Sequence, residues 1–166
     1  RGLISRGFKK GDALAILSST RWEWTAFDYA ALSIGMVVVP IYQTDSPLQI
    51  KSILNDTEAK ILIAEDRVQR EKIAEIQSEL PFMKSEWMLD EGALVTFCEL
   101  GKAVAEEEWE KRAEEVKETD LATIVYTSGS TDEPKGAELT HGMLCCNAYS
   151  ICMTVPQICY QDQGCY

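Results

Sequence analysis

The sequence has 166 residues, of which 46% are hydrophobic and 26% are charged, a balance typical of one globular domain of ordinary size. Its formal net charge of −11 argues against a nucleic-acid-binding surface, because neutralising phosphates requires clustered lysine and arginine. The most apolar run, "AALSIGMVVVPIY", is interrupted by Ser33, Gly35 and Pro40 and is too short to span a bilayer. We therefore expect neither a nucleic-acid partner nor a transmembrane segment.

Strand and helix signals alternate from the start of the chain. Residues 12–18, "DALAILS", are typical of a buried strand. Thr20 and Glu23 have the spacing of a capping box, which predicts a helix running to about Ile34 and apolar on most of its circumference. The next strand is expected in "MVVVPIY" and should end near Pro40, because proline cannot donate to a sheet ladder.

The same alternation continues through the middle of the chain. Ser46, Pro47 and Gln49 supply an N-cap, a proline at the first helical position and a second capping partner for a helix in residues 46–57. Residues 60–65, "KILIAE", form a third apolar stretch. Asp66 and Gln69 then predict the start of another helix.

This order predicts an α/β fold, in which a parallel sheet is flanked by helices and joined by right-handed crossovers. The strands lack polar alternation, as expected for strands buried on both faces. Residues 101–118 are different, because acids precede bases by four residues at Glu107 and Lys111 and at Glu108 and Arg112. We interpret this segment as an exposed connecting helix.

Five of the six cysteines lie between residues 145 and 165, but none forms a CxxC pair and the chain has a single histidine, His141. We interpret these cysteines as small apolar residues in a reducing compartment. A zinc site or a redox switch remains an alternative, and no metal ligand is assigned. His141 is interpreted as a structural or ligand-contacting group, not as a base.

The most informative segment is "YTSGSTDEPKG", residues 126–136, which follows the apolar stretch 121–125 and precedes a predicted helix in "LTHGMLCCNAYSICM". A donor-rich turn between a strand and a helix N-terminus is suited to hold an anion. It is not a Walker motif, because the second glycine, Gly136, follows Lys135 instead of preceding it, and neither Gly136 nor Ala137 offers the magnesium-binding hydroxyl group of a serine or threonine.

The segment "YTSGSTDEPKGAELTH" closely resembles the phosphate-binding signature YTSGSTGxPKGxxLTH of the adenylate-forming, or AMP-binding, enzymes. Upstream, "GFKKGDALAIL" and "ILNDTEAKILIAE" are also similar to the N-terminal region of these enzymes, and "VPIYQT" is similar to the version in long-chain fatty acyl-CoA ligases. The resemblance covers nearly the whole chain. It implies that residues 1–166 are the front part of the large N-terminal domain of an acyl-CoA synthetase-like enzyme.

The resemblance also implies a reaction, its substrates and a set of binding residues. The parent enzyme would form an acyl adenylate from a fatty acid and ATP with Mg²⁺, and then a thioester with coenzyme A. The residues that match the triphosphate-binding motif are Thr127, Ser128, Gly129, Ser130, Thr131, Lys135 and Gly136. Glycines permit a close backbone approach, hydroxyl groups donate hydrogen bonds, and lysine supplies a compact positive charge. No catalytic residue is assigned within this chain.

Two features depart from the family pattern. Asp132 stands where the family usually has glycine, and a carboxylate about 5 Å from a phosphate would be repelled by roughly 3 kcal/mol at an effective dielectric constant near 20. The chain also begins at Arg1 rather than methionine and ends before the family's adenine, ribose and magnesium motifs and its mobile C-terminal domain. We therefore expect an incomplete domain that is inactive by itself.

Two alternatives to a fatty acyl-CoA ligase remain open. One is a non-catalytic nucleotide-binding or interaction module on the same scaffold. The other is an aryl or amino-acid adenylating enzyme, because the residues that line an acyl pocket are not in this stretch. For the parent we expect a cytoplasmic location, with peripheral membrane association as an open alternative.

Overall fold

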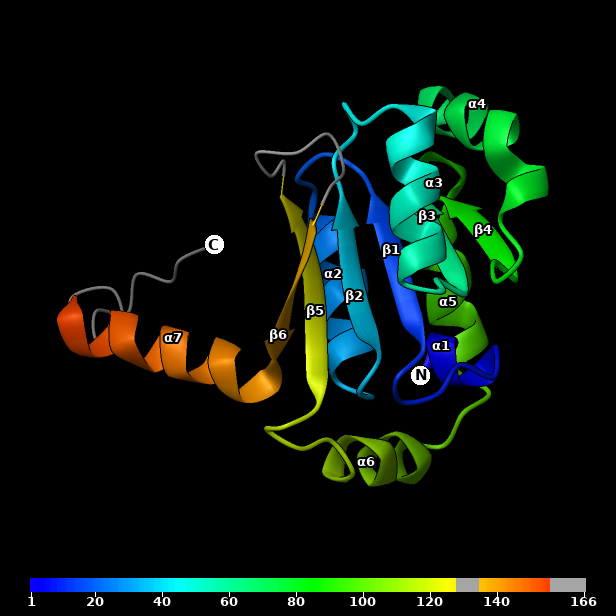
Figure 1. Cartoon of the computed structure of the whole chain (residues 1–166). Coiled ribbons are helices and arrows are strands. Elements are labelled where there is room, and N and C mark those ends of the chain that lie inside the picture. Colours follow the sequence, from blue (N-terminus) through cyan, green and yellow to red (C-terminus); the bar gives the residue numbers. More distant parts are fainter. Residues whose placement is uncertain (128–134, 156–166) are drawn as a thin grey trace.

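A computed structural model describes residues 1–127 and 135–155 as a six-stranded sheet covered by helices (Figure 1). The strand order is β4-β3-β1-β2-β5-β6. The strands are β1 (Ala13–Leu17), β2 (Val37–Ile41), β3 (Ile61–Ala64), β4 (Ser85–Met88), β5 (Leu121–Thr127) and β6 (Lys135–Thr140). The α-helices are α1 (Gly2–Ser5), α2 (Trp22–Leu32), α3 (Pro47–Asp56), α4 (Arg67–Ile76), α5 (Ala93–Gly101), α6 (Glu106–Glu114) and α7 (His141–Thr154), with short 3₁₀ helices at Gln77–Glu79 and Leu89–Glu91.

Five of these strands run parallel, which confirms the predicted α/β class. β1 lies in the middle of the sheet and pairs in parallel with both β2 and β3. β4 extends the sheet beyond β3, and β5 extends it beyond β2. All five parallel strands therefore end at the same edge of the sheet. Only β6 runs antiparallel, against β5.

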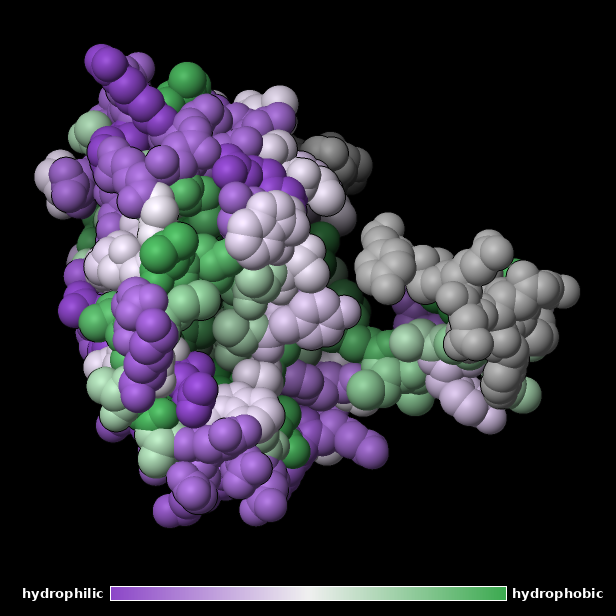
Figure 2. All heavy atoms as spheres, turned by 180° about the vertical axis from the view of Figure 1, so that it is seen from behind, coloured by the Kyte–Doolittle hydropathy of each residue, from purple (hydrophilic) through white to green (hydrophobic). Residues whose placement is uncertain are grey.

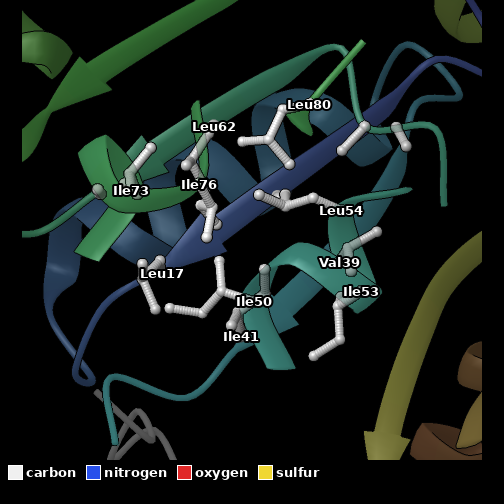
Figure 3. Close-up of a cluster of buried hydrophobic side chains, with 14 of the residues drawn as sticks. Leu17, Val39, Ile41, Ile50, Ile53, Leu54, Leu62, Ile73, Ile76 and Leu80 are labelled. Atoms are coloured by element: carbon white, nitrogen blue, oxygen red, sulfur yellow. The ribbon is translucent and has the colours of Figure 1, made fainter. Parts of the chain in front are cut away.

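The helices cover both faces of the sheet and divide the core into two clusters. On one face, alternate residues of the strands pack with Ile50 and Ile53 of α3 and with Ile73 and Ile76 of α4 (Figure 3). On the other face they pack with residues of α1, α2 and α5, including Phe27. Every residue of β1 is buried, as expected for a central parallel strand.

Two of the three predicted helix starts are confirmed with their caps. The Ser46 hydroxyl accepts a hydrogen bond from the Gln49 backbone N–H, and the Gln49 side chain bonds back to Ser46, which completes a capping box. The Asp66 carboxylate accepts a hydrogen bond from the Gln69 N–H at the start of α4. The capping box predicted at Thr20 is wrong. Arg21 is the N-cap of α2 and its side chain does not cap the helix.

The predicted end of β2 is confirmed, because the strand ends at Ile41, one residue after Pro40. Pro40 lies in register with Ile16 of β1, whereas the registered pairing of β2 with β5 is at Val38, two residues earlier. The absent N–H of the proline is therefore tolerated near the end of the strand. The prediction for α2 needs correction, because the helix is less covered than its composition predicts: Trp22 and Tyr29 are 71% and 68% exposed.

The acidic connecting helix is shorter than predicted, and two of its side chains hydrogen-bond to other parts of the fold. It spans Glu106–Glu114, and its expected ion pair between Arg112 and Glu108 is present at 2.9 Å. Arg112 also donates to the Phe8 carbonyl, and the Trp109 indole N–H donates to the Ser33 hydroxyl at 3.2 Å. The exposed acidic face is confirmed, but one side of α6 packs on the core.

The sequence reading did not identify β4 or α5. β4 is short and carries polar residues at Ser85 and Glu86, so it has no apolar run that would predict it. Within residues 1–127 and 135–155, none of the helices has both the length and the apolar character needed to cross a membrane.

One position in the fold has an unfavourable backbone conformation. Glu58 follows the C-cap of α3 and has a φ of 48°, a left-handed conformation in which a Cβ atom is strained. Ala59 N–H donates to the Leu54 carbonyl at 3.0 Å and closes the helix end around it. We predict that Glu58→Gly raises the free energy of unfolding by about 0.5 to 1 kcal/mol. Urea denaturation measures this gain. Glu58→Ala, which keeps the Cβ atom, should give no such gain.

Asp28 of α2 predicts a dependence of stability on pH. Burial raises the pKa of its carboxyl group from 3.8 to about 6, so the folded state binds this proton more tightly than the unfolded state. Stability is therefore lost as the pH rises from about 4 to about 6. Since Asp28 is only partly buried, we predict that Asp28→Asn stabilises the fold by about 1 to 2 kcal/mol at pH 7.5 and by little at pH 4. An equal gain at both values of pH in urea denaturation would contradict this assignment.

Candidate functional site

The candidate phosphate-binding segment connects the two strands of a β-hairpin. Thr127, the last residue of β5, lies opposite Lys135, the first residue of β6. The sequence predicted that this segment leads directly into a helix N-terminus, and that prediction is wrong. β6 comes between them, because residues 135–140 pair with β5 before α7 begins at His141. The anion-binding groups of this hairpin therefore cannot rely on the α7 helix dipole.

The structure describes three of the seven predicted binding residues. Thr127, Lys135 and Gly136 lie together at the end of the β5–β6 hairpin. Ser128, Gly129, Ser130 and Thr131 lie outside the described residues, as does Asp132. Their assignment to the triphosphate remains a prediction from the sequence.

Lys135 is an exposed cation at the edge of the sheet where the parallel strands end. Among the residues that the structure describes, no carboxylate lies within ion-pair distance of its ammonium group. In a chain with a net charge of −11, such a lysine supplies positive charge without a neutralising neighbour in the described part. It is suited to bind an anion.

Gly136 is required at its position by close packing within the hairpin. It lies opposite Tyr126, and a Cβ atom built on it would lie 2.8 Å from Ile124 Cγ2 and 3.0 Å from Tyr126 Cζ. A contact of 2.8 Å would require the Ile124 side chain or the strand to shift. The absence of a side chain at Gly136 thus allows β6 to lie close against the Tyr126 ring.

Tyr126 anchors the base of the hairpin to the neighbouring helix. Its side chain is buried, and its hydroxyl group donates a hydrogen bond to the Asp56 carboxylate at the end of α3. Burial raises the pKa of the Tyr126 hydroxyl, and so does the hydrogen bond with Asp56. The phenol therefore keeps its proton and remains a hydrogen-bond donor at neutral pH. Three residues earlier in β5, Thr123 Oγ1 donates to the Val38 carbonyl at 2.8 Å and links β5 to β2.

A crevice lies beside this site at the ends of β1 and β2. The helices that follow these two strands pack on opposite faces of the sheet, an arrangement in which open α/β sheets commonly bind ligands. The crevice has a volume of about 360 Å³. It is lined by Ser18, Ser19, Thr20, Trp24, Pro40, Ile41, Tyr42, Gln43 and Thr44.

A polar network fixes the loop that forms one wall of this crevice. The Glu65 carboxylate accepts two hydrogen bonds from Ser19, one from the backbone N–H and one from the hydroxyl, both at 2.7 Å. The Arg21 guanidinium bonds to Glu23 and Asp90, and its hydrogen bonds lower the pKa of Glu23. Sequence reasoning missed this network. The available signal was the polar residue that follows each apolar strand.

His141 begins α7 next to a groove between α2, α6 and α7. Its backbone N–H donates to the Asp120 carbonyl at 3.0 Å. Its Nε2 atom is buried and has no hydrogen-bond partner among the described residues. The groove has a volume of about 690 Å³ and is also lined by Asp28, Tyr29 and Cys145. Among the residues that the structure describes, the side chain of His141 thus has no partner for the structural hydrogen bond that the sequence suggested as one alternative.

The cysteines of α7 do not fill an apolar core. Cys145 and Cys146 are exposed free thiols, as is Cys98 of α5. The helix extends away from the sheet, as both overall views show (Figure 1 and Figure 2). In residues 1–127 and 135–155, no three histidine, cysteine or acidic residues are grouped as a metal site would require. The described part of the chain thus contains no ready-made magnesium or zinc site.

Comparison with known proteins shows which family this chain resembles. Residues 1–163 match the model of the family described as AMP-binding enzyme. The chain is 39% identical over 146 residues to a long-chain-fatty-acid–CoA ligase, FadD15, of Mycobacterium bovis, covering 86% of this chain and 24% of that protein. It is 30% identical over 150 residues to the ligase ACSBG2 of Xenopus laevis, covering 85% of this chain and 20% of that protein.

The solved structures of similar fold agree with this match. A Mycobacterium tuberculosis fatty acyl CoA synthetase superposes with a TM-score of 0.67 at 27% identity, covering 84% of this chain and 26% of that structure. A protein from Rhodopseudomonas palustris superposes with a TM-score of 0.76 at 22% identity, covering 93% and 38%. The chain spans about a quarter of the length of the curated relatives. The extent of the family match shows that this chain belongs to the AMP-binding enzyme family.

Proposed function

We propose that this chain is part of a longer ATP-dependent ligase that activates a fatty acid as an acyl adenylate and then transfers the acyl group to coenzyme A. The observation that carries the proposal is the family match through the β5–β6 hairpin, where Lys135 presents an exposed cation at the ligand-binding edge of the sheet. The two ligases named above support a long-chain fatty acid as the substrate.

The proposed reaction has two displacement steps. In the first, a carboxylate oxygen attacks the α-phosphorus of ATP, an acyl adenylate forms and pyrophosphate leaves. In the second, the coenzyme A thiol loses its proton, its sulfur attacks the acyl carbonyl carbon, and AMP leaves. Both steps depend mainly on positioning and on stabilising the charge that develops on phosphate oxygens.

Within this mechanism the hairpin would hold the triphosphate. Lys135 would offset negative charge on the phosphates, and Thr127 would donate through its hydroxyl group. The absence of a side chain at Gly136 leaves the backbone of β6 free to lie close to Tyr126. This close approach would fix the position of the neighbouring Lys135 relative to β5. Ser128, Gly129, Ser130 and Thr131 would complete this phosphate-binding segment.

Among the described residues no cluster of carboxylates offers a magnesium site, so we assign magnesium to no residue of this chain. We assign coenzyme A to no residue of this chain. For the parent we propose a cytoplasmic location, and peripheral membrane association remains an open alternative.

The activity is tested by ATP–pyrophosphate exchange in the full-length parent. Exchange that depends on a long-chain fatty acid supports the proposal. Exchange that depends on an aryl acid or an amino acid supports the other class of adenylating enzyme. No exchange with any carboxylic acid would indicate a non-catalytic module, in keeping with the acid at Asp132.

We predict that Lys135→Ala in the parent lowers the adenylation rate at subsaturating ATP by about 10- to 100-fold. The physical reason is the loss of one charge-assisted contact, which is worth about 1.5 to 3 kcal/mol. Lys84→Ala is the matched control, because Lys84 is also exposed but precedes β4 and so lies at the opposite edge of the sheet. Equal rates for the two variants would show that Lys135 does not contact the triphosphate.

A second prediction concerns residues 1–166 expressed by themselves. We expect no pyrophosphate exchange above background, because this length lacks the family's adenine, ribose and magnesium motifs. Circular dichroism should accompany the assay to establish that the chain is folded. Robust exchange by the pure chain would mean that catalysis does not need the longer protein.

A further inference from the structure

Tyr126 and Asp56 connect two parts of the chain that the phosphate-binding motif does not relate. Tyr126 immediately precedes the binding residue Thr127, whereas Asp56 is the last residue of α3, 70 positions earlier. The Tyr126 ring is only 7% exposed, and its hydroxyl group reaches the Asp56 carboxylate near the surface. The hydrogen bond thus fixes the end of a buried ring to a helix terminus.

The opposite strand depends on this ring. β6 is an edge strand whose registered partner is β5, and residues 135–138 are exposed, so burial of their side chains contributes little to holding them in place. Gly136 has no side chain, and a Cβ atom at this position would lie only 2.8 Å from Ile124 Cγ2 and 3.0 Å from Tyr126 Cζ. The position of the Tyr126 ring therefore determines how closely β6, and with it Lys135, can approach β5.

We propose that Tyr126 and Asp56 are a positioning pair that holds β6 close to β5 and thereby holds Lys135 at the position required for phosphate binding. This inference rests on the proposed function, because it assigns Lys135 to the triphosphate. Neither residue touches the substrate. Both act through the β5–β6 hairpin, Asp56 by holding the hydroxyl group and Tyr126 by supporting Gly136.

The electrostatic surroundings agree with a donor role for Tyr126. Burial, the hydrogen bond with Asp56 and the negative charges of Asp56 and Glu138 all raise the pKa of the Tyr126 hydroxyl. The group therefore remains protonated at neutral pH and can donate continuously to the carboxylate. An unprotonated tyrosine would be repelled by both acids.

The test uses the full-length parent with three single variants, the double variant of Tyr126→Phe with Asp56→Ala, and a control. Tyr126→Phe removes the hydroxyl group and keeps the ring against Gly136. Asp56→Ala removes the acceptor, whereas Asp56→Asn keeps an oxygen that can accept the hydrogen bond. Tyr29→Phe is the control, because Tyr29 is an exposed tyrosine on α2 on the other face of the sheet.

Pyrophosphate exchange then separates positioning from a merely structural role. We expect Tyr126→Phe and Asp56→Ala each to raise the KM for ATP about fivefold, the effect of one partly exposed hydrogen bond. The KM for the fatty acid should stay unchanged, and the double variant should be no worse than either single one. Asp56→Asn should lie within about twofold of the wild type, as should Tyr29→Phe.

Two outcomes of these measurements would contradict the proposal. A lower melting temperature with an unchanged KM for ATP would show that the pair supports the fold alone, and would overturn the proposal. Additive effects in the double variant would also overturn it, because the two side chains would then act separately.

Amide hydrogen exchange of residues 135–140 distinguishes this proposal from the proposed function. If the wild-type parent shows no pyrophosphate exchange, the proposed ligase activity fails, but the pair is still tested. Faster amide exchange in β6 with Tyr126→Phe than with Tyr29→Phe supports positioning by the pair. Equal amide exchange in the two variants overturns it.

Discussion

A parallel sheet that helices cover on both faces can present polar groups to a ligand only where its strands end. In this chain β1 is buried along its whole length, and the strands on either side share its direction. The polar residues that follow β1 and β2, and Thr127 at the end of β5, are therefore brought to one edge. The location of the crevice, the hairpin and Lys135 all result from this single constraint.

The hairpin adds a second requirement, because its outer strand has little buried surface of its own. Thr123 bonds to the Val38 carbonyl, and Tyr126 bonds to Asp56, so β5 is held to both β2 and α3. β6 is held through β5. In an acidic chain this arrangement places the exposed Lys135 where the parallel strands end, and we propose that this local cation rather than the net charge decides which ligand the edge attracts.

The sequence was sufficient to predict the parallel core and the positions of most helices. Apolar runs such as "KILIAE" are stable only when they are buried in the core, and the caps at Ser46 and Asp66 depend on residues only three positions apart. It was not sufficient at Thr20, where a spacing typical of a capping box was present but the helix begins after Arg21. There Arg21 bonds to its neighbour Glu23 and to Asp90, 69 positions away, and the second contact could not be read from the local sequence.

The candidate site was also predicted only in part. The motif singled out Lys135 and Gly136, whose role in binding stays a prediction, and β6 was unexpected because "KGAELT" has weak strand propensity and is stabilised by pairing with β5. Asp56 could not be found from the motif, since it is 70 positions from Tyr126 and has no sequence signal of its own. Such contacts depend on the tertiary fold, which brings the end of α3 beside β5.

The central claim is that the β5–β6 hairpin binds the triphosphate of ATP through Lys135. A crystal structure of the full-length parent with a non-hydrolysable ATP analogue tests it most directly. The account predicts that the Lys135 ammonium nitrogen lies about 3 Å from a phosphate oxygen, while Tyr126 remains bonded to Asp56. A bound analogue whose phosphates lie elsewhere, with Lys135 directed into solvent, would contradict it.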